Sequence, residues 1–301
     1  MAEITFDGRV AIVTGAGGGL GRTYALELAK RGAAVVVNDL GGSVNGEGGS
    51  DTAAQKVVDE IKAAGGDAVA SYDSVATPEG GEAIVQKAVD SFGKVDIVVN
   101  NAGILRDKSF AKMTLDDLHA VLDVHLKGAF YVSQPAFRIM KDNGYGRFVH
   151  TSSNSGIFGN FGQANYGAAK MGLVGLSNVL AIEGAKSNVL SNVIAPVART
   201  RMTEELMGDF AKVLDPEGVT PMVVYLCSEA CTFTHETFSA AAGRYARIFV
   251  GLTKGWYAGK DKLPTVEDVA DHIDDIENRD GYIVPNNSGD ELGLLMQVLN
   301  S

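Results

Sequence analysis

The sequence predicts an α/β fold: one doubly wound domain on a seven-stranded parallel sheet, followed by a C-terminal extension. Short runs rich in β-branched residues alternate with longer amphipathic runs, which is typical of parallel strands joined by helices. Several amphipathic runs stop at glycine, as helices often do. No internal repeat or long linker interrupts this alternation.

The predicted elements follow one another in a regular order. The strands are expected at 10–14, 34–39, 67–72, 95–100, 146–152, 188–195 and 236–241. The helices are expected at 21–32, 52–66, 82–93, 114–141, 166–187 and 222–233. The glycine-rich segment 40–51 is predicted to be a mobile loop. These boundaries assign residues 1–245 to the domain and 246–301 to the extension.

The extension is the least regular part of the sequence. It contains Trp256 and an acidic, helix-like run at 265–280. A surface extension or dimer contact is the favoured interpretation, and a lid that contacts a ligand is the alternative.

Composition excludes several classes of partner. The 301 residues are 46% hydrophobic and 21% charged, as in folded globular proteins. The formal net charge of −11 would repel nucleic acid and anionic lipid, so neither is expected as a partner. The N-terminal residues lack the pattern of a secretion signal, and the C-terminal residues match no peroxisomal or anchor signal, so a cytoplasmic location is predicted.

Cysteine and histidine usage predicts no metal site. Cys227 and Cys231 lie four residues apart, and buried thiols are favoured over a disulfide or a metal pair. The five histidines show no ligand spacing.

A glycine-rich turn joins the first strand to the first helix. Gly15, Gly19 and Gly21 provide the turn, with Leu20 between the last two. Such a turn lets backbone N–H groups approach a pyrophosphate, and the helix N-terminus adds partial positive charge. The pattern therefore predicts a dinucleotide site, with a merely tight turn as the alternative.

Asp39 ends the second strand, eighteen residues after Gly21. A carboxylate there can accept hydrogen bonds from the adenosine ribose and would repel a 2′-phosphate. Gly18 supplies no basic side chain to offset that repulsion, so NAD is favoured over NADP. A turn-forming aspartate before Gly41 is the alternative. Asn101 follows the fourth strand, where it could bridge neighbouring strands or touch the cofactor.

A serine, a tyrosine and a lysine predict the chemistry. Tyr166 and Lys170 are four residues apart on a predicted helix and therefore share one face. The ammonium is expected to lower the pKa of the phenol toward neutrality, which makes Tyr166 a candidate acid or base. Ser153, just past the fifth strand, could polarise a carbonyl oxygen. Lys170 could also hold the nicotinamide ribose.

Taken together, residues 14–21, 100–103, Ser153 and the Tyr166–Lys170 pair resemble the short-chain dehydrogenases/reductases in order and spacing, over about residues 8–245. The resemblance implies a Rossmann-like domain, NAD(P)-dependent oxidoreduction of an alcohol or ketone, and a homodimer or homotetramer. It also implies cofactor contacts from Asp73, Ser74, Asn101 and Thr200. Val197 stands where many relatives carry glycine.

Further runs, including "NNAGILRDKSFAKMT" and "SGIFGNFGQANYGAAK", are similar to the (3R)-hydroxyacyl-CoA dehydrogenase branch of this family, found in peroxisomal multifunctional enzymes. This similarity implies oxidation of a 3-hydroxyacyl thioester. A steroid alcohol or a steroid side-chain acyl-CoA is an alternative substrate, and a non-catalytic nucleotide-binding scaffold is an alternative of another class. In this branch His125 could join a proton relay through water or simply pack, and packing is slightly favoured.

Overall fold

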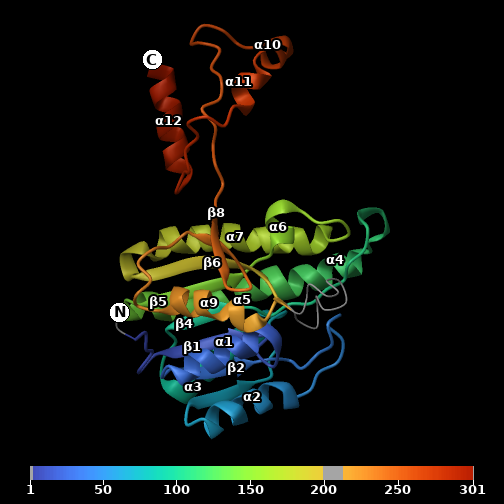
Figure 1. Cartoon of the computed structure of the whole chain (residues 1–301), viewed down its shortest axis with the longest axis vertical. Helices are drawn as coiled ribbons and strands as arrows, with labels where there is room; N and C mark the ends of the chain where they lie inside the picture. The colour runs from blue at the N-terminus through green and yellow to red at the C-terminus, as the bar shows by residue number, and fades with distance from the viewer. Residues whose placement is uncertain (1–2, 199–212, 301) are drawn as a thin grey trace. The chain divides into compact units, whose positions relative to one another are not determined.

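The computed structural model describes residues 3–198 and 213–300, and its strands form one eight-stranded sheet in the order β3-β2-β1-β4-β5-β6-β7-β8 (Figure 1). The strands are β1 (Val10–Thr14), β2 (Ala34–Asn38), β3 (Asp67–Ser71), β4 (Ile97–Asn100), β5 (Gly146–Thr151), β6 (Val189–Val197), β7 (Thr237–Ala241) and β8 (Arg244–Ile248). The strands from β1 to β7 pair in parallel. The predicted doubly wound α/β class is confirmed.

The strand order changes direction next to β1. From β1 the chain proceeds outward through β2 and β3, then returns to place β4 on the other side of β1. Ligands of open α/β sheets bind at the carboxyl ends of the strands beside such a point. The topology therefore locates the expected cleft where β1 and β4 end.

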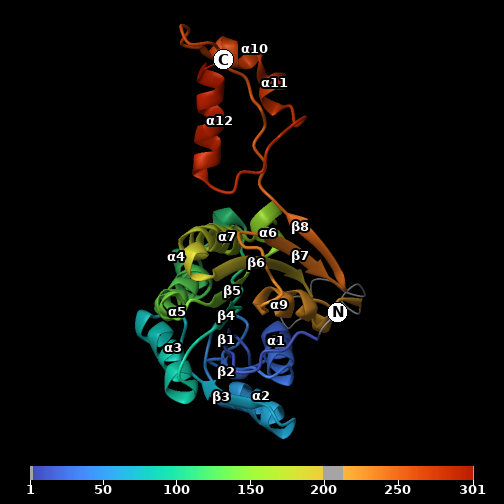
Figure 2. The ribbon, with the colours of Figure 1, turned by 90° about the vertical axis from the view of Figure 1, so that its left-hand side faces the viewer.

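Helices cover both faces of this sheet. They are α1 (Gly19–Lys30), α2 (Thr52–Ala63), α3 (Pro78–Phe92), α4 (Leu115–Leu122), α5 (Gly128–Asn143), α6 (Asn154–Phe158), α7 (Ala164–Gly184) and α9 (Thr220–Cys227). Figure 2 shows α1, α2 and α9 on one face and α3, α5 and α7 on the other. Each face has its own buried cluster of apolar side chains. No helix in the described ranges is long and apolar enough to cross a membrane.

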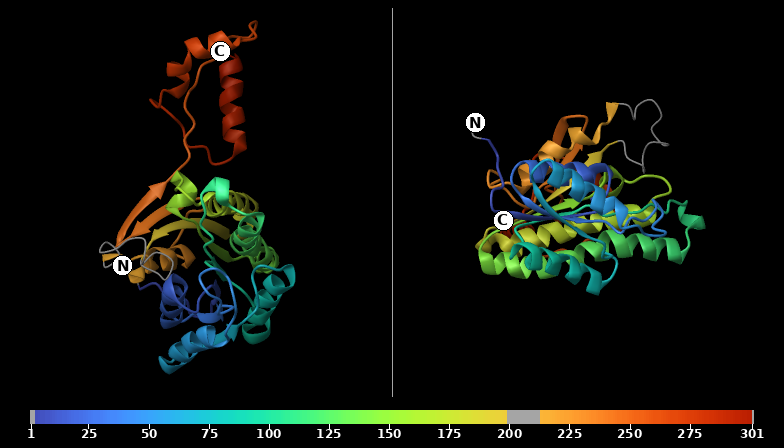
Figure 3. Two further views of the ribbon diagram at one scale, coloured as in Figure 1. Left: turned by 90° about the vertical axis from the view of Figure 1, so that its right-hand side faces the viewer. Right: turned by 90° about the horizontal axis from the view of Figure 1, so that it is seen from below.

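The prediction of seven strands is wrong by one. Ala242 and Gly243 both have positive φ and turn the chain directly from β7 into β8, which extends the sheet at its edge (Figure 3). A two-residue connection joins antiparallel neighbours. Residues of β8 are intermediate to exposed, so the strand lacks the apolar run that marks the others.

The helix predicted at 222–233 is shorter than expected. It ends at Cys227 because Ser228 is extended and its hydroxyl bonds the carbonyl of Tyr225 at 2.7 Å. Cys231 therefore lies beyond the helix. Both cysteines are free and buried, which confirms the prediction of buried thiols.

The predicted helix 114–141 contains a change of helical type. Between α4 and α5, residues Asp123–Lys127 form a π-helical turn that includes His125. Such turns are rare and often lie at functional sites.

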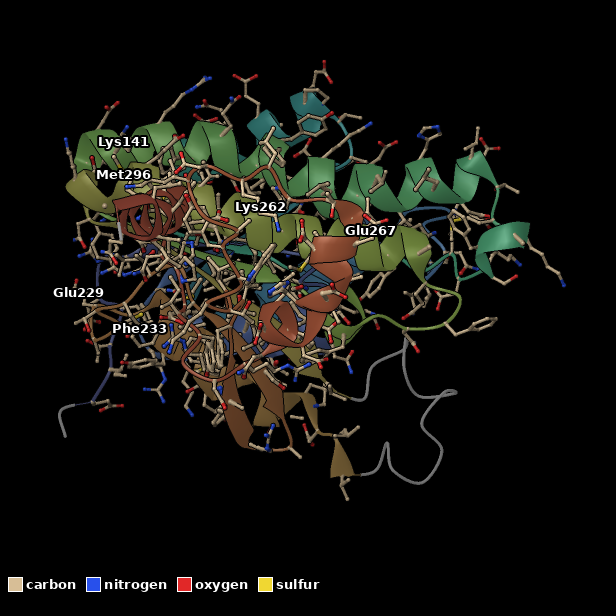
Figure 4. The ribbon with its side chains drawn as sticks, turned by 90° about the horizontal axis from the view of Figure 1, so that it is seen from above. Lys141, Glu229, Phe233, Lys262, Glu267 and Met296 are labelled. Atoms are coloured by element: carbon tan, nitrogen blue, oxygen red, sulfur yellow. The ribbon has the colours of Figure 1, made fainter. Side chains whose placement is uncertain are left out.

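A second unit begins at Ile248. It contains α10 (Val266–Asp271), α11 (Ile273–Glu277) and α12 (Ser288–Asn300), and the acidic run forms the first two. Trp256 stacks on His272 with ring centroids 4.1 Å apart. Figure 4 labels Lys262 and also Met296 of α12. The Nζ atom of Lys262 lies 2.6 Å from the Oδ1 atom of Asp268, near the start of α10. The role of this unit stays a prediction.

Candidate active site

The glycine turn packs closely against the end of β4. Gly15 has φ +63°, and a Cβ there would lie 2.7 Å from the Cα of Ala102. A Cβ on Gly21 would lie 2.3 Å from the carbonyl oxygen of Gly15. Any larger residue at either position would displace the turn. The N-terminus of α1 begins at Gly19 with no acidic side chain in its first turn, which suits an anionic ligand.

Asp39 is fixed beside this turn. One carboxylate oxygen accepts the N–H of Gly17 at 2.8 Å, and the other accepts the N–H of Gly41 at 2.7 Å. The bond to Gly41 is that of a turn-forming aspartate, and the bond to Gly17 also ties the carboxylate to the glycine turn. The two alternatives considered for Asp39 are therefore compatible.

Asn38 is a cleft residue that sequence reasoning missed. Its buried amide nitrogen donates to the carbonyl of Asp73 at 2.9 Å, while the hydroxyl of Ser71 donates to the carboxylate of Asp73 at 3.0 Å. These bonds hold Asp73 and the following Ser74 at the cleft wall. The end of an apolar strand gave no local signal for this role.

Asn101 bridges two strands. Its side chain donates to the carbonyls of Thr14 and Gly15 at 3.0 and 3.1 Å, and its N–H donates to the Thr14 hydroxyl at 3.0 Å. The bridging alternative is thus observed. Asn101 also lines the cleft, so a contact with the cofactor remains a prediction.

One cleft of about 780 Å³ brings most of the predicted residues together. The predicted residues that line it are Gly15, Gly19, Leu20, Asp39, Asp73, Ser74, Asn101, Ser153, Tyr166 and Lys170. Gly21 lies beneath the turn and does not line the cleft, whereas Val197 does. Thr200 lies outside the described residues.

Tyr166 and Lys170 project into this cleft from α7. The ammonium nitrogen of Lys170 lies 5.4 Å from the centre of the Tyr166 ring and donates to the carbonyl of Thr151 at 2.5 Å. Lys170 is 3% exposed, so the β5 carbonyl replaces water as its partner. The predicted shared face is therefore observed.

The sequence predicted a lowered pKa for Tyr166, and this prediction is wrong when only the protein's own groups are considered. Burial raises the pKa of Tyr166 to about 12, a hydrogen bond with Ser153 lowers it, and the negative charge of Asp107 raises it. Burial also lowers the pKa of Lys170 to about 7. Lys170 is therefore not the permanent cation that its type suggests, and burial has the largest effect on the pKa of the phenol.

Ser153 and its neighbour Ser152 have different roles. Ser153 caps the N-terminus of α6, where its hydroxyl accepts the N–H of Ser155 at 3.2 Å. Ser152 is buried and donates to the carbonyl of Lys170 at 2.7 Å. A hydrogen bond between Ser153 and Tyr166 lowers the pKa of the phenol, and the predicted role of Ser153 toward a carbonyl oxygen stays a prediction.

His125 packs against Tyr166. Its ring meets that of Tyr166 edge to face, with centroids 5.1 Å apart, and its Nε2 lies 2.8 Å from the carbonyl oxygen and 3.0 Å from the amide nitrogen of Ile104. Burial lowers its pKa well below the ordinary value. The packing alternative is observed. Nδ1 has no partner among the described residues, so the relay alternative stays open.

Comparisons with known proteins find relatives over most of the chain. A family model described as short chain dehydrogenase matches residues 9–209. The chain is 50% identical over 299 residues to peroxisomal multifunctional enzyme A of Dictyostelium discoideum, covering 99% of this chain and 66% of that protein. It is 40% identical over 241 residues to a hydroxyacyl-CoA dehydrogenase of Mycobacterium tuberculosis, covering 74% of each.

A solved structure extends the similarity to the second unit. Full-length peroxisomal multifunctional enzyme type 2 from Drosophila melanogaster matches with a TM-score of 0.84 and 43% identity, covering 99% of this chain and 50% of that chain. This chain thus spans half to two thirds of these two multifunctional proteins. The resemblance inferred from the motifs is confirmed.

Proposed function

The chain belongs to the short chain dehydrogenase family, and we propose that it oxidises a 3-hydroxyacyl-CoA thioester to the 3-ketoacyl-CoA, with NAD as hydride acceptor. Family membership makes it an oxidoreductase that acts on CH–OH groups. The observation that carries the proposal is the common cleft of Ser153, Tyr166 and Lys170 with the glycine turn and Asp39. The name of the mycobacterial relative supports the acyl-CoA substrate.

The residues of the cleft fit a nicotinamide dinucleotide. The turn leaves no room for side chains at Gly15 and Gly21, and the start of α1 offers N–H groups to a pyrophosphate. Asp39 presents a carboxylate that two N–H groups fix in place, which favours ribose hydroxyls over a 2′-phosphate. We therefore propose NAD rather than NADP. Asp73, Ser74 and Asn101 are proposed to contact it.

The catalytic residues divide the chemistry between them. NAD, when bound, would supply the hydride acceptor and a positive charge. The Tyr166 phenolate accepts the proton of the substrate hydroxyl. The hydride leaves the carbon atom that bears this hydroxyl. Ser153 holds the oxygen of that carbon by a hydrogen bond. Lys170, when protonated, favours the phenolate.

A spectrophotometric screen tests this proposal. NADH formation is followed at 340 nm with short, medium and sterol-derived 3-hydroxyacyl-CoA thioesters, and with free steroid alcohols. We expect turnover with at least one fatty thioester and a preference for NAD over NADP. Turnover of steroid substrates alone would select the alternative substrate class. NADH binding without turnover of any substrate would favour a scaffold.

Location and assembly are proposed from the sequence. We propose a cytoplasmic homodimer or homotetramer, in which residues 246–301 act as a lid or a dimer contact. The word peroxisomal in the names of two relatives points to a different compartment for those proteins. Light scattering of the purified protein tests the assembly, and fractionation of the source cells tests the location.

A further inference from the structure

Asn165 stands immediately before the proposed acid or base and is fully buried. Its side-chain oxygen accepts the N–H of Tyr166 at 2.8 Å. Its amide nitrogen donates to the carbonyls of Arg106 and Asp117, at 3.1 and 3.2 Å. One side chain therefore connects the start of α7 with two segments that lie 59 and 48 residues earlier in the chain.

The bond to Tyr166 supplies a missing partner. Tyr166 is the third residue of α7, and N–H groups in the first turn of a helix have no intrahelical acceptor. The Asn165 oxygen provides one, so the backbone that carries the phenol is held in a single place. The bonds to Arg106 and Asp117 fix Asn165 in turn.

Residues 104–108 form a strip between α7 and the loop after β2. On the α7 side, the Lys108 N–H donates to the carbonyl of Gly162 at 2.9 Å, and Gln163 donates to the Asp107 carboxylate at 2.7 Å. On the other side, Leu105 and Arg106 donate to carbonyls of that loop at 3.0 and 3.1 Å. The loop and the glycine turn line the same cleft. The 104–108 strip therefore connects the part of the cleft where the cofactor is expected with the segment that carries Tyr166.

We propose that Asn165 is a positioning residue, which sets the place of the Tyr166 hydroxyl by clamping the 104–108 strip and the start of α4 to α7. Asn165 is not among the residues that line the cleft, so it acts through Tyr166 and not by touching substrate. This inference rests on the proposed function. A displacement of the reacting groups by about 1 Å can reduce turnover by about 100-fold.

The test compares two buried asparagines. Asn192 on β6 is also fully buried and makes a similar set of bonds: its nitrogen donates to the carbonyl of Phe233 at 3.1 Å, and its oxygen accepts the N–H of Glu236 at 3.1 Å. It does not line the cleft. Asn192→Ala is therefore a matched control, because it should lower the stability of the protein without moving the Tyr166 hydroxyl.

We expect Asn165→Ala to lower kcat by about 10- to 100-fold while the KM for NAD and the Kd for NADH change by less than about threefold. Asn192→Ala is expected to lower the Tm comparably and to keep the wild-type kcat per folded enzyme. A wild-type kcat for Asn165→Ala would overturn the proposal. An equal loss of kcat in both variants would also overturn it, because the effect would then be general loosening.

A second variant and the activity of the wild type allow a clear outcome even if Asn165→Ala does not fold. If Asn165→Ala does not fold, Asn165→Ser is measured instead, since its hydroxyl keeps a polar group in the buried site but is too short to reach both carbonyls. A wild-type kcat for Asn165→Ser overturns the proposal. If the wild type itself oxidises no 3-hydroxyacyl-CoA, the proposed function fails and this inference fails with it. Normal wild-type turnover with unaffected Asn165 variants contradicts this inference alone.

Discussion

Replacing Lys170 by methionine is expected to stabilise the free protein near neutral pH while removing a group that the proposed chemistry needs. Burial lowers the pKa of Lys170 from its ordinary value of 10.5 to about 7. The unfolded chain therefore binds more protons than the folded protein between these two pH values. By linkage, the wild type gains stability as pH rises through this window, and Lys170→Met lacks that gain.

The size of the effect follows from the two pKa values. Because the folded protein binds the Lys170 proton more weakly than the unfolded chain, this group costs the wild type about 4 kcal/mol of unfolding free energy at pH 7 and about 1 kcal/mol at pH 9.5. The stability difference between Lys170→Met and wild type should therefore narrow by about 3 kcal/mol between these pH values. Loss of the bond to the Thr151 carbonyl and gain of apolar burial do not depend on pH, so they cancel in this comparison.

The assay is urea unfolding at both pH values without nucleotide. Lys141, exposed on α5 and labelled in Figure 4, provides the control, because Lys141→Met should show the same difference from wild type at pH 7 and pH 9.5. If the difference for Lys170→Met is also independent of pH, the lysine is not held in the dry site described here. That result would also contradict the proposed electrostatic effect of Lys170 on the neighbouring Tyr166.

Two other predictions concern the nucleotide side. Asp39→Asn keeps the shape of the side chain but removes its charge, so the preference for NAD over NADP in kcat/KM should fall about tenfold or more; an unchanged ratio would show that Asp39 does not select the cofactor. Gly21→Ala places a Cβ 2.3 Å from the Gly15 carbonyl oxygen, so it should destabilise the protein by about 1 to 3 kcal/mol and weaken NADH binding. Normal denaturant midpoints and NADH affinity for this variant would contradict the described turn.

Features that depend on residues close together in the sequence could be predicted. The glycine turn, the acidic residue after the second strand and the four-residue spacing of Tyr166 and Lys170 are local patterns with known geometry. Each therefore indicated its place in the cleft. The strands were also predicted closely, except for β8, whose half-exposed residues lack an apolar run.

Features that depend on distant partners could not be predicted. The pKa of Tyr166 is set by burial, which depends on how α7 packs and not on the distance to Lys170 alone. Asn165 looks like an ordinary polar residue beside Tyr166, because its partners lie 48 and 59 residues earlier. The role of the loop after β2 was hidden for the same reason, since its bonds are made to residues 105 and 106.

The most direct measurement is the turnover of Tyr166→Phe beside its affinity for NADH. The variant removes the hydroxyl that is proposed to exchange a proton and leaves the ring in place against His125. With a substrate that the wild type oxidises, we expect kcat to fall by at least about 100-fold while the Kd for NADH is unchanged. A variant that oxidises this substrate at the wild-type rate would show that the proton leaves by another route.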